Sequence, residues 1–70
     1  MAIELEVQRL ELEDVVVVDI PGEDAEFEAT VVRDIDRTEN TVRATLRVEG
    51  RDEFVKEWPI DTMVTVVRGP

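Results

Sequence analysis

The chain has 70 residues, of which 18 are acidic and eight basic, so its formal net charge is −10, and it contains no cysteine, histidine, serine or tyrosine. A chain of this length forms one small domain that buries only about 60% of the surface its unfolded form exposes. The missing residue types exclude disulfide bonds, the usual zinc sites and cysteine or serine nucleophiles. We therefore predict a single non-catalytic domain over residues 1–70, with no cofactor and no bound metal.

Apolar residues make up 43% of the chain, close to the level of folded globular proteins. The longest uninterrupted apolar run is Val15 to Val18, far shorter than the roughly 18 residues that a membrane-spanning helix needs. The N-terminal sequence MAIELEVQ has neither the basic region nor the apolar stretch of a signal peptide. We therefore expect a cytoplasmic protein that makes no contact with a membrane.

Residues 1–11 give an ambiguous strand signal. Thirteen valines and six threonines, many at alternating positions, favour β-strands in the chain as a whole. In this first segment the apolar residues alternate up to Val7 and then change parity at Leu10. The segment is therefore predicted to be either an extra edge strand or an extended lead-in.

Two strands are predicted next. Residues 15–20, VVVVDI, are apolar on both faces, as in a strand covered by neighbours, and a Pro-Gly turn signal follows them. Residues 26–35 alternate through Val31 and then place Arg33 where the next inward residue belongs. This break in alternation predicts a β-bulge near Val32 and Arg33.

The second half of the chain reads as three more strands. Residues 41–49 alternate strictly between apolar and polar side chains, which predicts one buried and one exposed face. Hairpin turns are predicted on either side, at residues 36–40 and 49–52. The remaining elements are a strand at 53–58 that Pro59 ends, a single tight turn at 59–62 and a last strand at 63–68.

The order of these segments resembles that of the SH3-like small barrels, a group that includes SH3 and Tudor domains and the barrels of translation and transcription factors. The likeness covers residues 12–68, and its most telling part is the break at PIDT, where SH3-like barrels commonly place a short 3₁₀ turn. The resemblance implies an all-β fold, a closed five-stranded barrel at residues 12–68, with residues 1–11 as a lead-in or an added edge strand. A fold alone implies no function.

One acidic segment, DIDRT at residues 34–38, allows two chemical interpretations. It matches the D-x-D-x-T signature of haloacid-dehalogenase-type phosphotransferases, but those enzymes need a much larger parallel sheet. Asp34, Asp36 and Glu39 are also hard oxygen ligands for calcium, although the EF-hand pattern is incomplete. We predict instead a solvated hairpin turn that Asp36 and Asn40 help to shape.

The chain has three aromatic residues, Phe27, Phe54 and Trp58. The cage with which Tudor-type readers bind methylated lysine needs several rings. Because the core requires at least two of these three, we expect no cage. Trp58, which stands just before Pro59 at a strand end, is predicted to lie in the core or at its rim.

The charge is distributed unevenly. Residues 1–30 contain ten acids and one base, whereas residues 31–70 contain eight acids and seven bases. The leading hypothesis is an interaction module that docks through its acidic surface to a protein partner, expected to be basic. Adaptation of the host to salt or to a GC-rich genome is the other explanation of the acidity. The residues assigned to the acidic surface are Glu11, Glu13, Asp14, Glu23, Asp24, Glu26 and Glu28.

A second hypothesis is a nucleic-acid-associated barrel of the translation or transcription type. Its contacts with backbone phosphates would come from a basic patch on strand faces, although a net charge of −10 opposes polyanion binding. The same basic residues can instead pair with Glu49, Glu53 and Glu57 across the sheet. A homodimer through apolar strand surface, at Val15 and Val17 or at Thr65 and Val67, is a further alternative. The predicted basic patch consists of Arg33, Arg43, Arg47 and Lys56.

Overall fold

The computed structural model describes residues 1–20 and 22–67, and its regular elements there are β-strands and one short 3₁₀ helix. These elements are β1 (Ala2–Glu6), the 3₁₀ helix η1 (Val7–Arg9), β2 (Val15–Asp19), β3 (Glu26–Arg37), β4 (Thr41–Arg47), β5 (Phe54–Pro59) and β6 (Met63–Val67). The prediction of an all-β fold is confirmed. In this described part of the chain, no helix has the length and apolarity that crossing a membrane requires.

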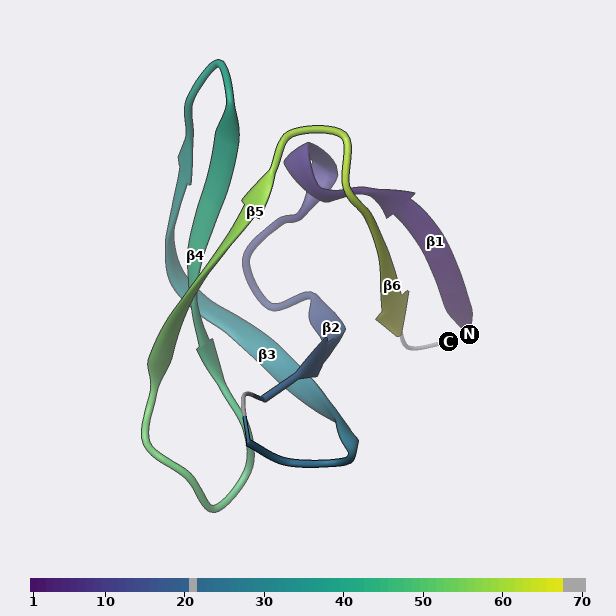
Figure 1. The fold of residues 1–70 in the computed structure, drawn as a ribbon, viewed down its shortest axis with the longest axis vertical. Helices are drawn as coiled ribbons and strands as arrows, with labels where there is room; N and C mark the ends of the chain where they lie inside the picture. The colour runs from purple at the N-terminus through teal and green to yellow at the C-terminus, as the bar shows by residue number, and fades with distance from the viewer. Residues whose placement is uncertain (21, 68–70) are drawn as a thin grey trace.

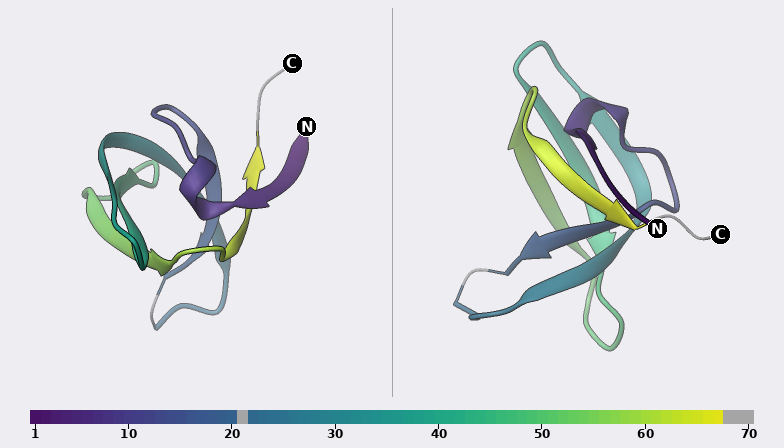
Figure 2. Two further views of the ribbon diagram at one scale, coloured as in Figure 1. Left: turned by 90° about the horizontal axis from the view of Figure 1, so that it is seen from above. Right: turned by 90° about the vertical axis from the view of Figure 1, so that its right-hand side faces the viewer.

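All six strands pair antiparallel in one sheet, in the order β1-β6-β2-β3-β4-β5. Strands β2 to β6 curl around a common interior, while β1 extends the sheet beside β6 (Figures 1 and 2). The sheet is open, because β1 and β5 are its two edges and do not pair with each other. The prediction of a closed barrel is therefore wrong: five strands follow residue 12, as predicted, but the sheet that they form with β1 does not close.

The N-terminal segment supplies the added strand β1 and, after it, residues 7–10, which cover one end of the sheet and which we call the cap. All of β1 pairs with β6, so for this part of residues 1–11 the edge-strand alternative is correct. The chain then turns through η1 across the end of the curled sheet (Figure 2), and the Val7 N–H donates to Thr62 O at 2.8 Å. A 3₁₀ turn brings residues three apart to the same side. Val7 and Leu10 therefore both face the interior, which explains the change of parity at Leu10.

Side-chain hydrogen bonds hold this cap in place. Gln8 Nε2 donates to Asp61 Oδ1 at 2.7 Å, and the Asp61 N–H donates to Gln8 Oε1 at 3.0 Å. Arg37, at the end of β3, donates from Nε to Gln8 O at 2.9 Å and from Nη2 to Leu10 O. The β5–β6 turn and the end of β3 are thereby both tied to the cap.

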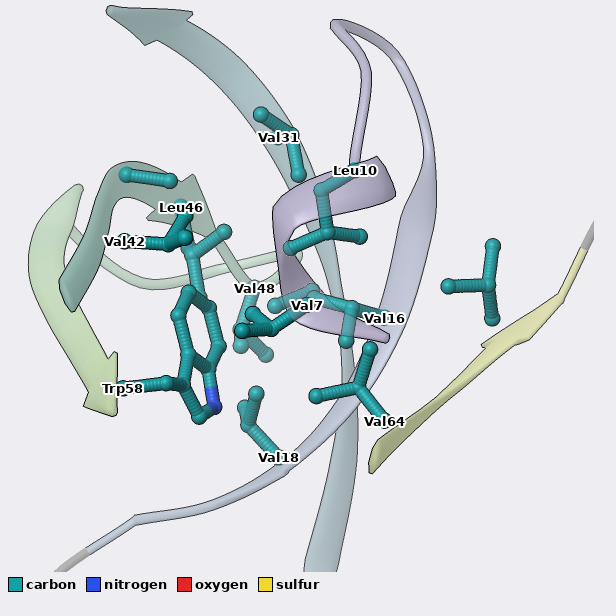
Figure 3. Close-up of a cluster of buried hydrophobic side chains, with 13 residues drawn as sticks. Val7, Leu10, Val16, Val18, Val31, Val42, Leu46, Val48, Trp58 and Val64 are labelled. Atoms are coloured by element: carbon teal, nitrogen blue, oxygen red, sulfur yellow. The ribbon is translucent and has the colours of Figure 1, made fainter. Parts of the chain in front are cut away.

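The core consists of the inward side chains of the curled sheet together with those of the cap (Figure 3). Its largest fully buried residues include Leu10 from the cap and Leu46 from β4. Among the described residues it contains no buried polar or charged side chain. Apolar burial therefore supplies most of the stability. The buried residues are Val7, Leu10, Val16, Val18, Ala29, Val31, Val42, Ala44, Leu46, Val48, Trp58, Val64 and Val66.

Strand β3 contains two irregularities that help the sheet to curl. Between Val31 and Arg33 its register with β4 shifts, so the predicted bulge at Val32 is confirmed. A second shift, which was not predicted, lies between Arg33 and Asp36, where Asp34 adopts φ 48°. Aspartate tolerates this left-handed conformation better than most residues. Bulges bend a strand and increase its twist, which allows β3 to pair with β2 at one end and with β4 at the other.

The hairpin between β3 and β4 is shaped by Thr38 rather than by Asp36 and Asn40. Thr38 Oγ1 accepts hydrogen bonds from the N–H groups of Asn40 at 3.2 Å and Thr41 at 2.9 Å. The Thr38 N–H donates to Thr41 O at 2.9 Å. Asp36 instead forms an ion pair with Arg43 at 3.3 Å.

The two later turns are confirmed where they were predicted. After β4, the Arg51 N–H donates to Val48 O at 3.0 Å, and Gly50 adopts φ 81°, a conformation that favours glycine. After β5, the Thr62 N–H donates to Pro59 O at 3.2 Å and closes a single tight turn.

Two predictions extend beyond the described residues. The turn signal after β2 includes Pro21, and the last predicted strand, residues 63–68, includes Arg68, and both residues lie outside the described part of the chain. The described portions agree with the predictions. Gly22 adopts φ 86°, which is typical of a glycine turn position. Strand β6 covers residues 63–67 of the predicted strand.

The cap makes a testable contribution to stability. Leu10→Ala should lower the free energy of unfolding by about 2–5 kcal/mol, because Leu10 is fully buried and its removal leaves a cavity under η1. Leu12→Ala is the matched control: Leu12 is 58% exposed, so the same change should cost less than about 0.5 kcal/mol. Urea denaturation of both variants measures the difference. Equal losses would contradict a structural role for the cap.

Candidate functional site

The predicted acidic residues divide into two groups. Glu11, Glu13 and Asp14 lie in the turn before β2, where Asp14 Oδ2 accepts the Glu11 N–H at 2.9 Å. The other four, Glu23, Asp24, Glu26 and Glu28, lie beyond the opposite end of β2 or along β3. Because the five residues of β2 span roughly 16 Å, the structure does not unite all seven carboxylates.

Glu23 is engaged in a structural ion pair. Arg51 Nη2 donates to Glu23 Oε1 at 2.8 Å, and Nη1 donates to the other carboxylate oxygen. The guanidinium carbon of Arg51 also lies 4.7 Å from the centroid of the Phe27 ring. Mainly through the hydrogen bond, Arg51 lowers the pKa of the Glu23 carboxyl. This pair joins the β2–β3 loop to the β4–β5 loop.

Four other carboxylates form what we call the acidic face. They are exposed, and none forms an ion pair within the described residues. The register of β2 with β3 places Asp19 opposite Glu26, and Val17 opposite Glu28. Asp19 was not assigned to the acidic surface from the sequence, because only the pairing with β3 brings it beside Glu26. The members of the acidic face are Asp19, Asp24, Glu26 and Glu28.

An apolar stripe runs beside the acidic face on the outer side of the sheet. Strand β6 lies between β1 and β2, and its outward residues are less acidic than those of its neighbours. In register, Glu4 lies opposite Thr65 and Glu6 opposite Met63, so glutamates also border the far side of the stripe. Met63 is 55% exposed, and the other four residues are half-buried. The stripe consists of Val15, Val17, Met63, Thr65 and Val67.

The sheet opens between β2 and β6. These strands pair only through Val15 with Val67 and Val16 with Val66, and beyond these residues they diverge (Figure 2). A depression of about 320 Å³ occupies the opening and reaches β5 on the far side. We refer to this depression as the β2–β6 fork. Its lining residues are Val17, Val18, Asp19, Glu26, Lys56, Trp58, Thr62, Met63, Val64 and Thr65.

Trp58 forms part of the fork as well as of the core. Its side chain packs near Val18 at one end of the core (Figure 3), and it is almost completely buried. Within the described residues, the indole N–H of Trp58 donates no hydrogen bond. Every buried polar side-chain atom of these residues has a partner, so this N–H is not among the buried atoms. The indole N–H therefore reaches solvent and is available as a donor. The prediction that Trp58 belongs to the core or its rim is confirmed.

Arg33, Arg43 and Arg47 of the predicted basic patch share the outer face of β3 and β4, whereas Lys56 does not. The register places Arg33 opposite Thr45, the residue that lies between Arg43 and Arg47 along that face of β4. Arg33 pairs with Glu53 at 2.5 Å, as the cross-sheet alternative predicted, whereas Arg43 pairs with Asp36. Lys56 stands opposite the buried Ala44, so its side chain emerges on the other face of the sheet, in the fork.

Arg47 lies on the outer face of β4. It makes no ion pair within residues 1–20 and 22–67, but it lines a shallow depression of about 530 Å³ together with Glu28 and Glu49. The positive charge of this arginine is therefore bordered by carboxylates. This mixture of signs gives the outer face of β4 no strong preference for a polyanion.

The acidic residues of the DIDRT segment and its neighbour Glu39 occupy different structural positions. Asp34 lies in the second bulge of β3, Asp36 pairs with Arg43, and Glu39 is at the hairpin tip. In the part of the chain that the structure describes, no group of three or more acidic side chains is placed to hold a metal ion.

No protein-family model, curated protein or solved structure matches the chain. The arrangement of its own residues is therefore the basis for assigning a function. The features that distinguish the surface are the acidic face, the apolar stripe and the β2–β6 fork.

The pairing of Glu23 with Arg51 predicts a specific pH dependence. Because the pKa of Glu23 is lowered in the folded state, the pair stabilises the protein above the unfolded-state pKa of this group, and the benefit is lost as pH falls through the lowered value. In Arg51→Gln, Glu23 should titrate at higher pH, and stability should decline less on acidification. Carboxyl NMR titration and denaturation at several pH values measure both effects. Arg47→Gln, at an arginine outside these ion pairs, should leave the Glu23 titration unchanged.

Proposed function

We propose that this protein is a non-catalytic interaction module that docks through its acidic face to a basic protein partner. The observation that carries the proposal is the contrast between two surfaces. The acidic face keeps four exposed carboxylates without ion pairs in the described residues, whereas Arg33 and Arg43 on the β3–β5 side are paired with carboxylates of the same chain. A field of this sign attracts cations and speeds their association.

The absence of catalysis is part of the proposal and rests on composition. The chain has no histidine or cysteine, and its one lysine, Lys56, lines the fork beside Asp19 and Glu26. The remaining candidates for chemistry are carboxylates and threonines, whose groups need activation by a neighbour before they act as nucleophiles or bases at neutral pH. Docking requires no such activation.

We further propose that strands β2 to β6 are a variant of the SH3-like arrangement. Three features support this interpretation: the meander of β2 to β5, the tight turn at Pro59–Thr62, and the return of β6 beside β2. Strand β1 and the cap would then be additions to that arrangement. The fold proposal and the docking proposal are independent of each other.

The nucleic-acid hypothesis is the weaker alternative. Two of its four basic residues are paired with carboxylates, and Lys56 lies on the other face of the sheet. A polyanion would have to approach a molecule with net charge −10 through Arg47, the one residue of these four that remains.

Charge reversal on the acidic face tests the proposal. Binding of a short fluorescent lysine-rich peptide should weaken about tenfold in the double variant Glu26→Lys and Glu28→Lys, because four units of favourable charge are lost at the contact. The control, Glu39→Lys with Glu57→Lys, makes the same change in net charge at exposed positions away from the acidic face and should weaken binding much less. Fluorescence anisotropy at low salt measures both.

The salt dependence completes this test. Association of the wild-type protein with the peptide should slow strongly as ionic strength rises, since the Debye length falls from about 30 Å at 0.01 M to about 3 Å at 1 M. Equal weakening in the two double variants, or a rate that ignores salt, would contradict docking through the acidic face. Tighter binding of a short RNA than of the peptide would favour the nucleic-acid alternative instead.

A further inference from the structure

We infer that the β2–β6 fork receives an extended segment of the basic partner, in which an apolar side chain is flanked by lysine or arginine. This inference rests on the proposed function and identifies where on the surface the partner is held. Three features of the fork lead to it: strand edges that face each other unpaired, an apolar floor with a free donor, and an acidic rim.

The unpaired strand edges provide a template for main-chain hydrogen bonds. Beyond Val16 and Val66, the facing edges of β2 and β6 form no ladder with each other, while their opposite edges are paired with β3 and β1. An extended peptide can add to such an edge. The outer edges of the sheet are less suitable, because β1 carries two glutamates and β5 carries charges and ends at Pro59.

The floor of the fork suits an apolar side chain. Val17 and Met63 stand at its mouth, and the nearly buried Trp58 and Val64 line it from below. Covering the exposed part of Met63 removes apolar surface from water, which favours binding. The indole N–H of Trp58 reaches solvent and can donate to a carbonyl of the incoming segment.

The rim selects for positive charge. Asp19 and Glu26 line the fork on the side of β2 and β3, and Glu28 follows opposite Val17. Basic side chains on either side of the apolar anchor would reach these carboxylates. Lys56 stands on the β5 side, so the carboxylates of the fork are concentrated on the side of β2 and β3.

A second copy of this chain does not fit the same surface. Rows of acidic residues border the apolar stripe on both sides, with Glu4 and Glu6 on β1 and with Glu26 and Glu28 on β3. Two copies joined through the stripe would bring these rows together, and like charges placed opposite each other oppose association. The complementary occupant is therefore a basic segment with an apolar residue.

Three synthetic peptides of equal length test this inference with the full chain: alternating Val-Lys, alternating Gly-Lys and alternating Val-Glu. The Val-Lys peptide should bind at least about tenfold more tightly than Gly-Lys, because it alone combines apolar and basic side chains. Val-Glu should not bind. Trp58 is the single tryptophan of the chain, so its fluorescence and its indole N–H resonance report directly on the fork. Both should change with Val-Lys, together with the amide resonances of residues 17–19 and 63–65.

Two matched substitutions locate the contact. Val17→Lys places a cation at the mouth of the fork and should weaken Val-Lys binding at least about tenfold. Val55→Lys makes the same change on the outer face of β5, at a residue that is 62% exposed, and should alter binding less than about twofold. If Val17→Lys does not fold, Met63→Lys probes the same opening at a residue that is more than half exposed.

The outcomes separate this inference from the proposed function. If Val-Lys and Gly-Lys bind equally and perturb only Glu26 and Glu28, the fork is not the contact, although docking through the acidic face stands. If neither peptide binds, the docking function itself fails. If the fork resonances change with protein concentration in the absence of peptide, a second copy occupies the fork and the inference is overturned.

Discussion

A small curled sheet leaves the ends of its interior open, and in this protein the segment after β1 covers one of them. Val7 and Leu10 enter the core from η1, and the 3₁₀ turn places both on the same side. Without that cover, the inward valines of the sheet would meet water at this end, and a domain of this size has little stability to lose. Arg37 and the exchange between Gln8 and Asp61 tie the cap to two different parts of the sheet. The remaining architecture depends on this closure.

The cap also helps to explain why the sheet opens between β2 and β6. Strand β6 pairs with all of β1 but with only two residues of β2. The turn at Pro59–Thr62 and the Val7–Thr62 hydrogen bond hold the start of β6 beside the cap, away from the end of β2. The strands therefore meet at one end and separate at the other. A structure in which they paired fully would have no fork.

The charged residues are also divided between two sides of the sheet, one with ion pairs and one without them in the described residues. On the side of β3 to β5, arginines pair with carboxylates of neighbouring strands and loops, and such exposed pairs contribute little to stability but reduce the local field. Along β2 and the first half of β3, the carboxylates of the acidic face form no ion pair within the described residues, although Lys56 lines the fork with two of them and Arg47 lies near Glu28. Repulsion within this group costs the isolated protein some stability, and a cationic partner would relieve it. The proposed docking and the charge repulsion would therefore be two consequences of one distribution.

The sequence by itself determined the features that depend on neighbours along the chain. Strict alternation located β4, the misplaced Arg33 located the first bulge, and Pro59 with Thr62 located the last turn, because side-chain period and turn chemistry act over a few residues. Only the tertiary structure decided what depends on strand partners. The sequence could not show that Lys56 faces away from Arg43, that Asp19 lies beside Glu26, that Leu10 closes the core, or that β2 and β6 part after two residue pairs. Register and pairing partners are set by contacts between segments far apart in the chain, and a pattern along one strand contains no information about where its neighbour ends.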